Sequence, residues 1–345
     1  MSAAAPDMDP FPAAADSATS TFSRIADLPV EVEEIRLPGL DEDIVVAAGR
    51  GATGRGEIVR GYPLPVERTS WEGVSESILG RWPFHLLSHR LDECNLTNGQ
   101  RWAVETACLA LGLAQQGRTL AEALGRKLRP VRFSLHQQAA GRPFEVERLL
   151  AWIRTDPGLR LSVDADPAWD DRTLAALAET GAVEVVDLHS YEEDPMPPPE
   201  SCLRICSALP HALLEDPALV EETRRPLAAH PGGVSWDAAI YSTIEIEALD
   251  ARAVNIRPAR FATWRRLLDA YDHCRTHQIL CYAGSSGEGP LGRLQLRYLA
   301  ALFHPDAPNQ TAPHWLEEAD PERPPVPLLN PAPTALFESA FGRPH

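Results

Sequence analysis

Short hydrophobic runs, each ending at a charged residue, recur through the second half of the chain. Four of them lie between residues 183 and 258: VEVVDLH, ALLEDP, VSWDA and AVNIRP. Continuous apolar runs of this length, separated by segments with helical spacing, are typical of buried parallel strands. The first three runs end on an acid and the fourth on a base: Asp187, Glu215, Asp237 and Arg257.

The same alternation of strands and helices extends in both directions. Further strand candidates are VRFSL (131–135), LRLSVDAD (159–166) and QILCYAG (278–284), and helical spacing is found at 143–154, 173–181 and 261–277. Seven strands in this order favour an eight-stranded parallel barrel over a doubly wound open sheet, because a barrel gathers the polar residues at its strand ends on one face. We expect the eighth strand to be very short or to lie near residues 305–313.

The N-terminal part has a different pattern, which predicts a small α+β domain. Alternation over 29–48 predicts a two-stranded hairpin, the glycines that follow predict turns into another strand, and 70–88 and 98–117 have helical spacing. The chain therefore divides into four expected parts. These are a disordered tail (1–22), an α+β domain (23–128), a barrel domain (129–315) and a Pro-rich C-terminal segment (316–345).

Composition narrows the functional classes. The formal net charge of −17 and pI near 5.1 argue against nucleic acid or an anionic membrane as a partner. Nothing resembles a transmembrane span or a signal peptide, which predicts a cytoplasmic protein. The six cysteines are scattered, which argues against a disulfide framework, and we expect Cys202 and Cys206 to be buried thiols rather than zinc ligands.

Several of these segments resemble the enolase superfamily, in particular its muconate-lactonizing and mandelate-racemase-like members. The segments ATGRGE, LLEDP, VSWDA, VNIRPARF and YAGSSGEGPLGRLQLRYLAALFHPDAPN carry the resemblance. It implies an α+β capping domain followed by an enolase-type modified (β/α)8 barrel. It also implies that cap loops near Gly49–Gly54 close over the substrate, and that acids ending three consecutive strands hold Mg²⁺.

The acids that fit this magnesium site are Asp187, Glu215 and Asp237. The first two are 28 residues apart and the last two 22, and each spacing is close to one strand–helix unit. In an alternative register, VDADPAW resembles the first-ligand segment of some relatives, which would make Asp164 the first ligand. We prefer Asp187, because Asp164 would leave one strand too few before it and one too many after it.

The chain departs from the family where the resemblance implies catalytic lysines. Ser162 and Asp164 stand where a Lys-x-Lys pair is expected, and Arg257 stands at the opposite lysine. A guanidinium stays protonated near neutral pH and is a poor general base. His189 and Asp164 are therefore the candidate bases, Arg257 is a candidate clamp for a substrate carboxylate, and Glu288 is a candidate to orient the substrate or to pair with Arg257.

The function that this resemblance implies is Mg²⁺-dependent abstraction of a proton next to a carboxylate, by a lyase or an isomerase such as a racemase. The expected partner is a small carboxylate substrate, and relatives often form homo-oligomers. The alternative is a non-catalytic enolase-like protein that acts in binding or regulation, which the missing lysines motivate. A dehydrogenase or NTPase is disfavoured, because no phosphate-binding fingerprint follows a strand.

Overall fold

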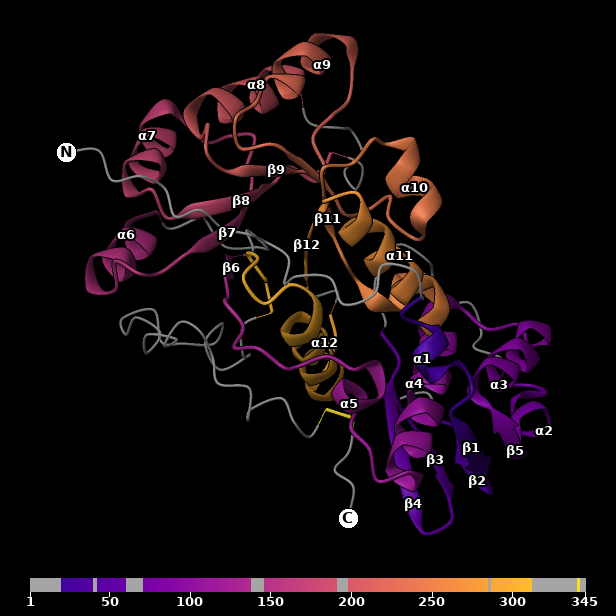
Figure 1. Cartoon of the computed structure of the whole chain (residues 1–345). Coiled ribbons are helices and arrows are strands. Elements are labelled where there is room, and N and C mark those ends of the chain that lie inside the picture. The colour runs from indigo at the N-terminus through magenta and orange to yellow at the C-terminus, as the bar shows by residue number, and fades with distance from the viewer. Residues whose placement is uncertain are drawn as a thin grey trace.

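The computed structural model of the protein describes residues 20–39, 42–59, 71–137, 146–190, 198–284, 287–311 and 340–341. Most of the predicted tail (1–22) and most of the predicted C-terminal segment (316–345) lie outside the described residues. The described chain forms an N-terminal α+β part and a larger strand–helix part (Figure 1).

The N-terminal part combines short strands with helices. Its elements are α1 (Ser23–Ala26), β1 (Pro29–Val32), β2 (Glu34–Arg36), β3 (Ile44–Gly49), β4 (Ala52–Glu57), α2 (Val74–Ile78), β5 (Gly80–Pro83), α3 (Phe84–Arg90), η1 (Leu91–Glu93), α4 (Asn98–Gln115) and α5 (Leu120–Leu124). Strands β2, β3 and β4 form one antiparallel sheet, and β1 pairs with β5. The predicted hairpin over 29–48 is therefore confirmed for β2 and β3, whereas β1 pairs elsewhere.

Two sequence-based expectations for this part are wrong in detail. Gly54 and Gly56 lie within β4 and not in turns, because α4 packs directly on that strand. A Cβ atom on Gly54 would lie 2.1 Å from the Ala107 carbonyl oxygen, and one on Gly56 would lie 2.0 Å from that of Ala103. The helix predicted over 70–88 is also interrupted, because β5 leaves it at Gly80 (φ +109°) to pair with β1.

Helix α4 was predicted from its periodicity, and its start is fixed by a capping box. The Thr97 hydroxyl accepts a hydrogen bond from the Gln100 backbone N–H, and the Gln100 side chain accepts one from the Thr97 N–H. The cap is therefore Thr97, and the helix begins at Asn98, where the predicted helical spacing begins. Asn98 instead donates a hydrogen bond of 2.8 Å to the Arg260 carbonyl in the second part of the chain.

The second part alternates strands and helices in parallel order. Its elements are β6 (Leu135–Gln137), α6 (Val146–Thr155), β7 (Leu161–Asp164), α7 (Asp171–Thr180), β8 (Val183–Asp187), α8 (Pro199–Ala208), β9 (Leu213–Glu215), α9 (Glu221–Ala228), β10 (Val234–Trp236), α10 (Thr243–Ala248), β11 (Ala253–Asn255), η2 (Pro258–Phe261), α11 (Trp264–Thr276), β12 (Leu280–Tyr282) and α12 (Pro290–Phe303). The strands pair in chain order from β6 to β12. Figure 1 shows α6 to α9 along the outside of this sheet.

A short segment after α12 closes the sheet into a barrel. Gln310 donates its backbone N–H to the Ala283 carbonyl at 2.7 Å, next to β12. On the other side, Ser134 donates its N–H to the Asn309 carbonyl at 2.9 Å, and Phe133 forms a parallel bridge with Asn309. Up to residue 311, where the described part of this range ends, the eighth strand is represented by the bridge at Asn309, and the predicted α/β barrel is confirmed.

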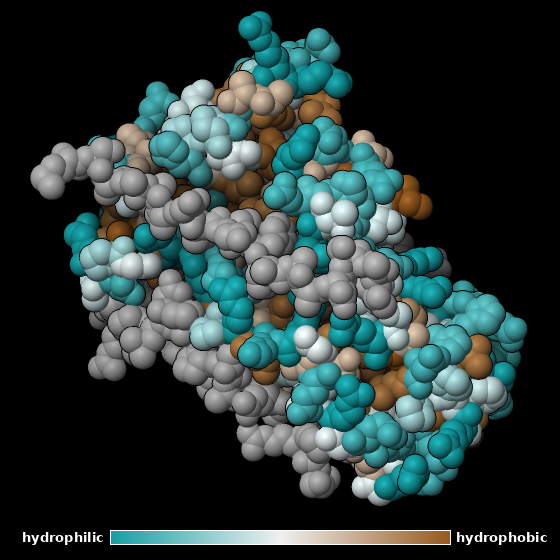
Figure 2. Space-filling view, in the orientation of Figure 1, coloured by the Kyte–Doolittle hydropathy of each residue, from teal (hydrophilic) through white to brown (hydrophobic). Residues whose placement is uncertain are grey.

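The two parts share one hydrophobic core, in which the Trp102 ring of α4 stacks on Trp264 of α11 with ring centroids 4.9 Å apart. At the surface, hydrophilic residues cover most of the described face drawn in Figure 2, and hydrophobic residues appear in scattered patches. Five of the six free cysteines are buried, Cys202 and Cys206 among them, as expected. Among the described residues, the helices are all too short or too polar to cross a membrane.

Candidate metal centre and active site

The predicted acids meet at the carboxyl ends of neighbouring barrel strands. Strand register pairs Asp164 with Asp187 and Asp187 with Glu215, so these residues stand side by side on β7, β8 and β9. Asp237 directly follows β10. Asp187, Glu215 and Asp237 are all buried, and each places a carboxylate oxygen within 4.8 Å of the other two.

Glu215 lies inside the barrel and is surrounded by neutral hydrogen-bond donors. Its Oε2 accepts from the Tyr282 hydroxyl at 2.6 Å and from Gln310 Nε2 at 3.1 Å, and its Oε1 accepts from Asn255 Nδ2 at 2.8 Å. Burial, and then the charge of Asp237, raise the pKa of Glu215 to about 7, against the lowering effect of Arg257. This carboxyl group is therefore one that a nearby cation would stabilise in its charged form.

Asp237 is neutralised by two arginines. Its Oδ1 accepts from Arg257 Nε at 2.7 Å and from Arg260 Nη1 at 2.8 Å, and Arg257 also contacts Oδ2 through Nη2. Burial lowers the pKa of Arg257, but the charges of Asp237 and Glu215 outweigh it and raise the pKa overall. Arg257 is thus fully charged and is held against Asp237, which excludes it as a general base.

A row of titratable groups continues from Asp187 toward β6. His189 Nε2 lies 3.6 Å from Asp187 Oδ2 and 3.2 Å from Asp164 Oδ1, and His136 Nε2 lies 3.4 Å from the same Asp164 oxygen. The His189 backbone has a positive φ of +47° and donates its N–H to Asp187 Oδ1 at 3.0 Å. A turn after β8, rather than strand alternation, therefore brings the imidazole to the mouth of the barrel.

Asp216 links the ends of β9 and β10. Its carboxylate accepts the backbone N–H groups of Asp237 at 2.9 Å and Ala238 at 2.8 Å. Burial, followed by the charge of Asp237, raises the pKa of Asp216 to about 6. Asp216 consequently fixes the backbone that carries Asp237 and adds further negative charge to the mouth.

The donor set fits a divalent cation on the Asp187 side. Burial, and then the charge of Glu215, raise the pKa of Asp187 well above its usual range, which indicates uncompensated negative charge there. Asn255 supplies a further oxygen: its Oδ1 has no hydrogen-bond partner among the described residues, although Asn255 is only 1% exposed. Carboxylate and amide oxygens are the ligands preferred by hard cations such as Mg²⁺.

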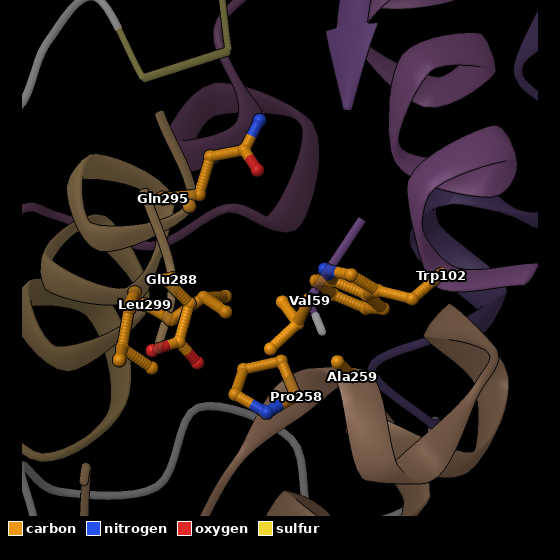
Figure 3. Close-up of a pocket in the computed structure, with 9 residues that line it drawn as sticks. Val59, Trp102, Pro258, Ala259, Glu288, Gln295 and Leu299 are labelled. Atoms are coloured by element: carbon orange, nitrogen blue, oxygen red, sulfur yellow. The ribbon is translucent and has the colours of Figure 1, made fainter. Parts of the chain in front are cut away.

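Glu288 lies at the junction of the two parts of the chain. Its charge acts on Arg257, and its side chain lines a pocket together with Val59 and Trp102 from the N-terminal part and Pro258 from the barrel (Figure 3). The charge of Glu288 therefore reaches Arg257, while its side chain lines the pocket at the junction of the two parts.

The N-terminal part holds the Glu288 turn in place through Glu57. The Glu57 carboxylate accepts the backbone N–H groups of Leu291 at 3.1 Å and Gly292 at 3.0 Å, and it also contacts the Gly289 N–H. These groups form the start of α12, where the helix dipole favours a negative charge. Glu57 thereby ties β4 to the segment that follows Glu288.

The expectation that loops near Gly49–Gly54 close over the substrate is not met. Gln115, at the C-terminal end of α4, donates to the Gly49 carbonyl at 3.1 Å, whereas Asn98, at the N-terminal end, contacts the barrel. Since α4 has 18 residues, it is about 27 Å long, and the β3–β4 turn lies at its far end. Val59, just after β4, is instead the residue of this segment that lines the pocket near Glu288.

Sequence reasoning missed several residues that complete the site: His136, Asp216, Asn255, Arg260, Tyr282 and Gln310. Two of them had a usable signal. Asp216 directly follows Glu215 at a strand end, and Tyr282 ends β12 beside Asn255 of β11 in the parallel register. Arg260 had no such signal, because it reaches Asp237 from the 3₁₀ turn η2 rather than from a strand.

Comparisons with solved structures identify the architecture. An enolase superfamily member from Listeria innocua has 19% identity and a TM-score of 0.61, and the match covers 82% of each chain. A probable mandelate racemase from Alicyclobacillus acidocaldarius has 15% identity and a TM-score of 0.61, over 83% of this chain and 82% of that one. A muconate cycloisomerase from Pseudomonas fluorescens has 18% identity and a TM-score of 0.62, over 82% of this chain and 87% of that one.

These matches confirm the expected enolase-type fold, including the α+β capping part. No curated protein matches the sequence. One family model does match, and it is described as the C-terminal domain of a domain of unknown function, DUF8230. Because this model spans residues 127–318, more than half of the 345-residue chain, the protein belongs to the DUF8230 C-terminal domain family.

Proposed function

We propose that the protein is a magnesium-dependent enzyme that removes a proton next to a substrate carboxylate, as a lyase or an isomerase. The observation that carries the proposal is the cluster of Asp187, Glu215 and Asp237, whose carboxylate oxygens lie within 4.8 Å of one another at the ends of three successive strands. The muconate cycloisomerase and mandelate racemase names among the structural neighbours support this reaction class.

Asp187, Glu215 and Asp237 would hold Mg²⁺, with Asn255 Oδ1 close to Glu215. A magnesium ion on a substrate carboxylate would acidify the adjacent carbon and stabilise the negative charge that develops there. Arg257, already placed against Asp237, adds a fixed positive charge beside this position and can bind a second anionic group of the substrate.

His189 is the residue that would take the proton, and Asp164 would orient it. The imidazole Nε2 lies 3.2 Å from Asp164 Oδ1 and borders Asp187, so it faces the side of the mouth opposite Arg257. An imidazole held by a carboxylate is a common general base. His136, on the other side of Asp164, extends this pair and helps to fix the orientation of the carboxylate.

The test is solvent exchange. The full chain, with Mg²⁺, is incubated in deuterium oxide with a panel of α-substituted carboxylates, and loss of the Cα proton is followed by NMR. His189→Asn should slow exchange on a responding compound by about 100-fold or more, since general bases contribute on this scale. His211→Asn, which changes an exposed histidine outside the site, serves as the matched control. Equal exchange rates in both variants would contradict the role of His189.

A second candidate function is favoured by the two arginines on Asp237. A carboxylate already neutralised by Arg257 and Arg260 has less need of a metal, which suits a non-catalytic protein that binds carboxylate ligands. Calorimetry separates the two functions. Carboxylates that bind without any solvent exchange in the presence of Mg²⁺ would favour the binding protein over the enzyme.

A further inference from the structure

A second group of metal-ligating side chains lies at the mouth of the barrel, next to the three acids. Asp164, at the end of β7, stands beside Asp187, at the end of β8, in the parallel register. Together with His189 they offer three ligand atoms that all lie within 4.8 Å of one another. This group contains an imidazole, and it shares only Asp187 with the group of Asp187, Glu215 and Asp237.

The distances within the group suit atoms that bind one ion. His189 Nε2 lies 3.2 Å from Asp164 Oδ1 and 3.6 Å from Asp187 Oδ2. Two ligand atoms at about 2.0–2.1 Å from a tetrahedral zinc ion are about 3.3–3.4 Å apart. The observed separations lie on either side of this value, so an ion fits between the imidazole and the two carboxylates with small side-chain adjustments.

A buried hydroxyl group lies in the same part of the barrel. Ser162 and Asp164 are two residues apart on β7, so their side chains point to the same face of the strand. Ser162 is 0% exposed, and its Oγ has no hydrogen-bond partner among the described residues. A water molecule bound to an ion at Asp164 would supply this partner. The His189 side chain is 26% exposed, so an ion can reach the group from solvent.

We propose that Asp164, Asp187 and His189 bind a transition-metal ion such as Zn²⁺, beside the proposed magnesium site. Imidazole is a preferred ligand of Zn²⁺, whereas Mg²⁺ prefers a set made of oxygen atoms alone. The two sites therefore select different ions. Asp187 has two carboxylate oxygens with several lone pairs, so it can serve both ions.

The second ion would inhibit proton removal, a consequence that rests on the proposed role of His189. A neutral imidazole has one nitrogen that carries a hydrogen and one that can accept a proton. An ion on Nε2 occupies the accepting nitrogen and leaves the hydrogen on Nδ1, so neither nitrogen can take a proton from the substrate. Binding of Zn²⁺ itself needs only the three side chains and not the enzymatic activity.

The experiment is a calorimetric titration of the full chain with Zn²⁺ in the presence of saturating Mg²⁺. We expect one tight Zn²⁺ site in the wild type that weakens by about 10-fold or more in His189→Gln and in Asp164→Asn. His211→Gln, which changes an exposed histidine outside the group, should bind Zn²⁺ as the wild type does. Melting temperatures without metal show whether each variant is folded, and the use of two variants keeps the test valid if one is not.

Glu215→Gln separates this site from the proposed magnesium site. This variant keeps all three ligands of the second group, so it should retain the tight Zn²⁺ site while its Mg²⁺ binding weakens. Zn²⁺ binding that depends on His189 in a protein that binds no Mg²⁺ would support the second site and contradict the proposed function. A wild type without a tight Zn²⁺ site would overturn the second site, whatever the result for Mg²⁺. Equal Zn²⁺ affinity and stoichiometry in the wild type, His189→Gln and Asp164→Asn would overturn it as well.

Discussion

Glu215 and Asp237 are neighbouring buried carboxylates, but their hydrogen-bond partners differ in charge. Asp237 is bound by the guanidinium groups of Arg257 and Arg260, so its charge is matched inside the protein. Among the described residues, the hydrogen bonds to Glu215 come from neutral donors on Asn255, Tyr282 and Gln310. The pKa of Glu215 is correspondingly raised to about 7, mainly by burial.

This difference shows on which side of the mouth a cation is needed. Hydrogen bonds orient a buried carboxylate but do not cancel its charge, and an unpaired buried charge is costly. Asp187, next to Glu215, also has a raised pKa. We infer that a bound ion would mainly compensate the charges of Asp187 and Glu215, whereas Asp237 is a proposed ligand whose charge Arg257 and Arg260 already match.

The largest effect on stability should come from removing one of the two arginines that pair with Asp237. Arg260→Leu leaves the buried Asp237 with one guanidinium instead of two and should lower the free energy of unfolding by about 3–5 kcal/mol. Urea denaturation measures this change. Arg224→Leu is the control: the Arg224 side chain is 66% exposed, and its loss should change stability by about 0.5 kcal/mol or less. Equal small effects in both would contradict the pairing.

The raised pKa of Glu215 should make the stability of the metal-free protein depend on pH. The pKa of Glu215 is raised in the folded state from its ordinary value of 4.5 to about 7, so the folded protein binds this proton more tightly than the unfolded chain. Stability should therefore fall by about 3 kcal/mol as the pH rises from about 4.5 to about 7. Saturating Mg²⁺ should remove the fall. A stability that rises with pH over this range would contradict the assignment. The difference between the wild type and Glu215→Gln gives the part of the pH dependence that is due to Glu215.

A smaller effect is expected when one neutral donor to Glu215 is removed. Tyr282→Phe deletes the hydroxyl that donates to Glu215 Oε2, while the Gln310 donor remains. The free energy of unfolding should fall by about 1–2 kcal/mol above pH 7, where Glu215 is charged. The same variant at pH 5 is its own control, because a protonated Glu215 depends less on that donor. An equal loss at both pH values would mean that the hydroxyl acts through packing and its hydrogen bond with Ser235 Oγ at 2.8 Å, and not through the charge of Glu215.

Glu57 is a third kind of buried carboxylate, because backbone N–H groups at the start of α12 donate to it. Glu57→Gln keeps the shape but removes the charge that favours the helix N-terminus, and should cost about 1 kcal/mol. Thermal unfolding tests this against Glu34→Gln, which alters an exposed strand residue. No difference between the two variants would show that the charge of Glu57 adds nothing.

The strand order and the acids were predictable because they depend on local pattern. A short apolar run predicts a buried strand, and parallel strands bring their C-terminal ends to one edge, so Asp187, Glu215 and Asp237 could be placed together from sequence alone. The donors to Glu215 could not be placed in the same way. They come from 40 to 95 residues away in the chain, and their contacts depend on how the barrel closes.

The glycines and the lysines show two further limits of prediction from the sequence. Gly54 and Gly56 have the composition of a turn, but they lie in a strand because α4 approaches its backbone, a tertiary contact without a local signal. The absent catalytic lysines carry less information than the family resemblance implies. Lys127 is the single lysine among the 32 Lys and Arg residues of the whole chain, so arginine at position 257 follows its general composition.

Calorimetric titration of the metal-free protein with Mg²⁺ tests the central claim most directly. We predict one Mg²⁺ site in the wild type that weakens by about 10-fold or more in Glu215→Gln, because the amide removes the charge of one proposed ligand. His211→Gln changes an exposed histidine that lies before β9 and is not a proposed ligand, and it should bind as the wild type does. A wild type that binds no Mg²⁺ with or without a carboxylate ligand, or a Glu215→Gln variant that binds it equally well, would contradict the claim.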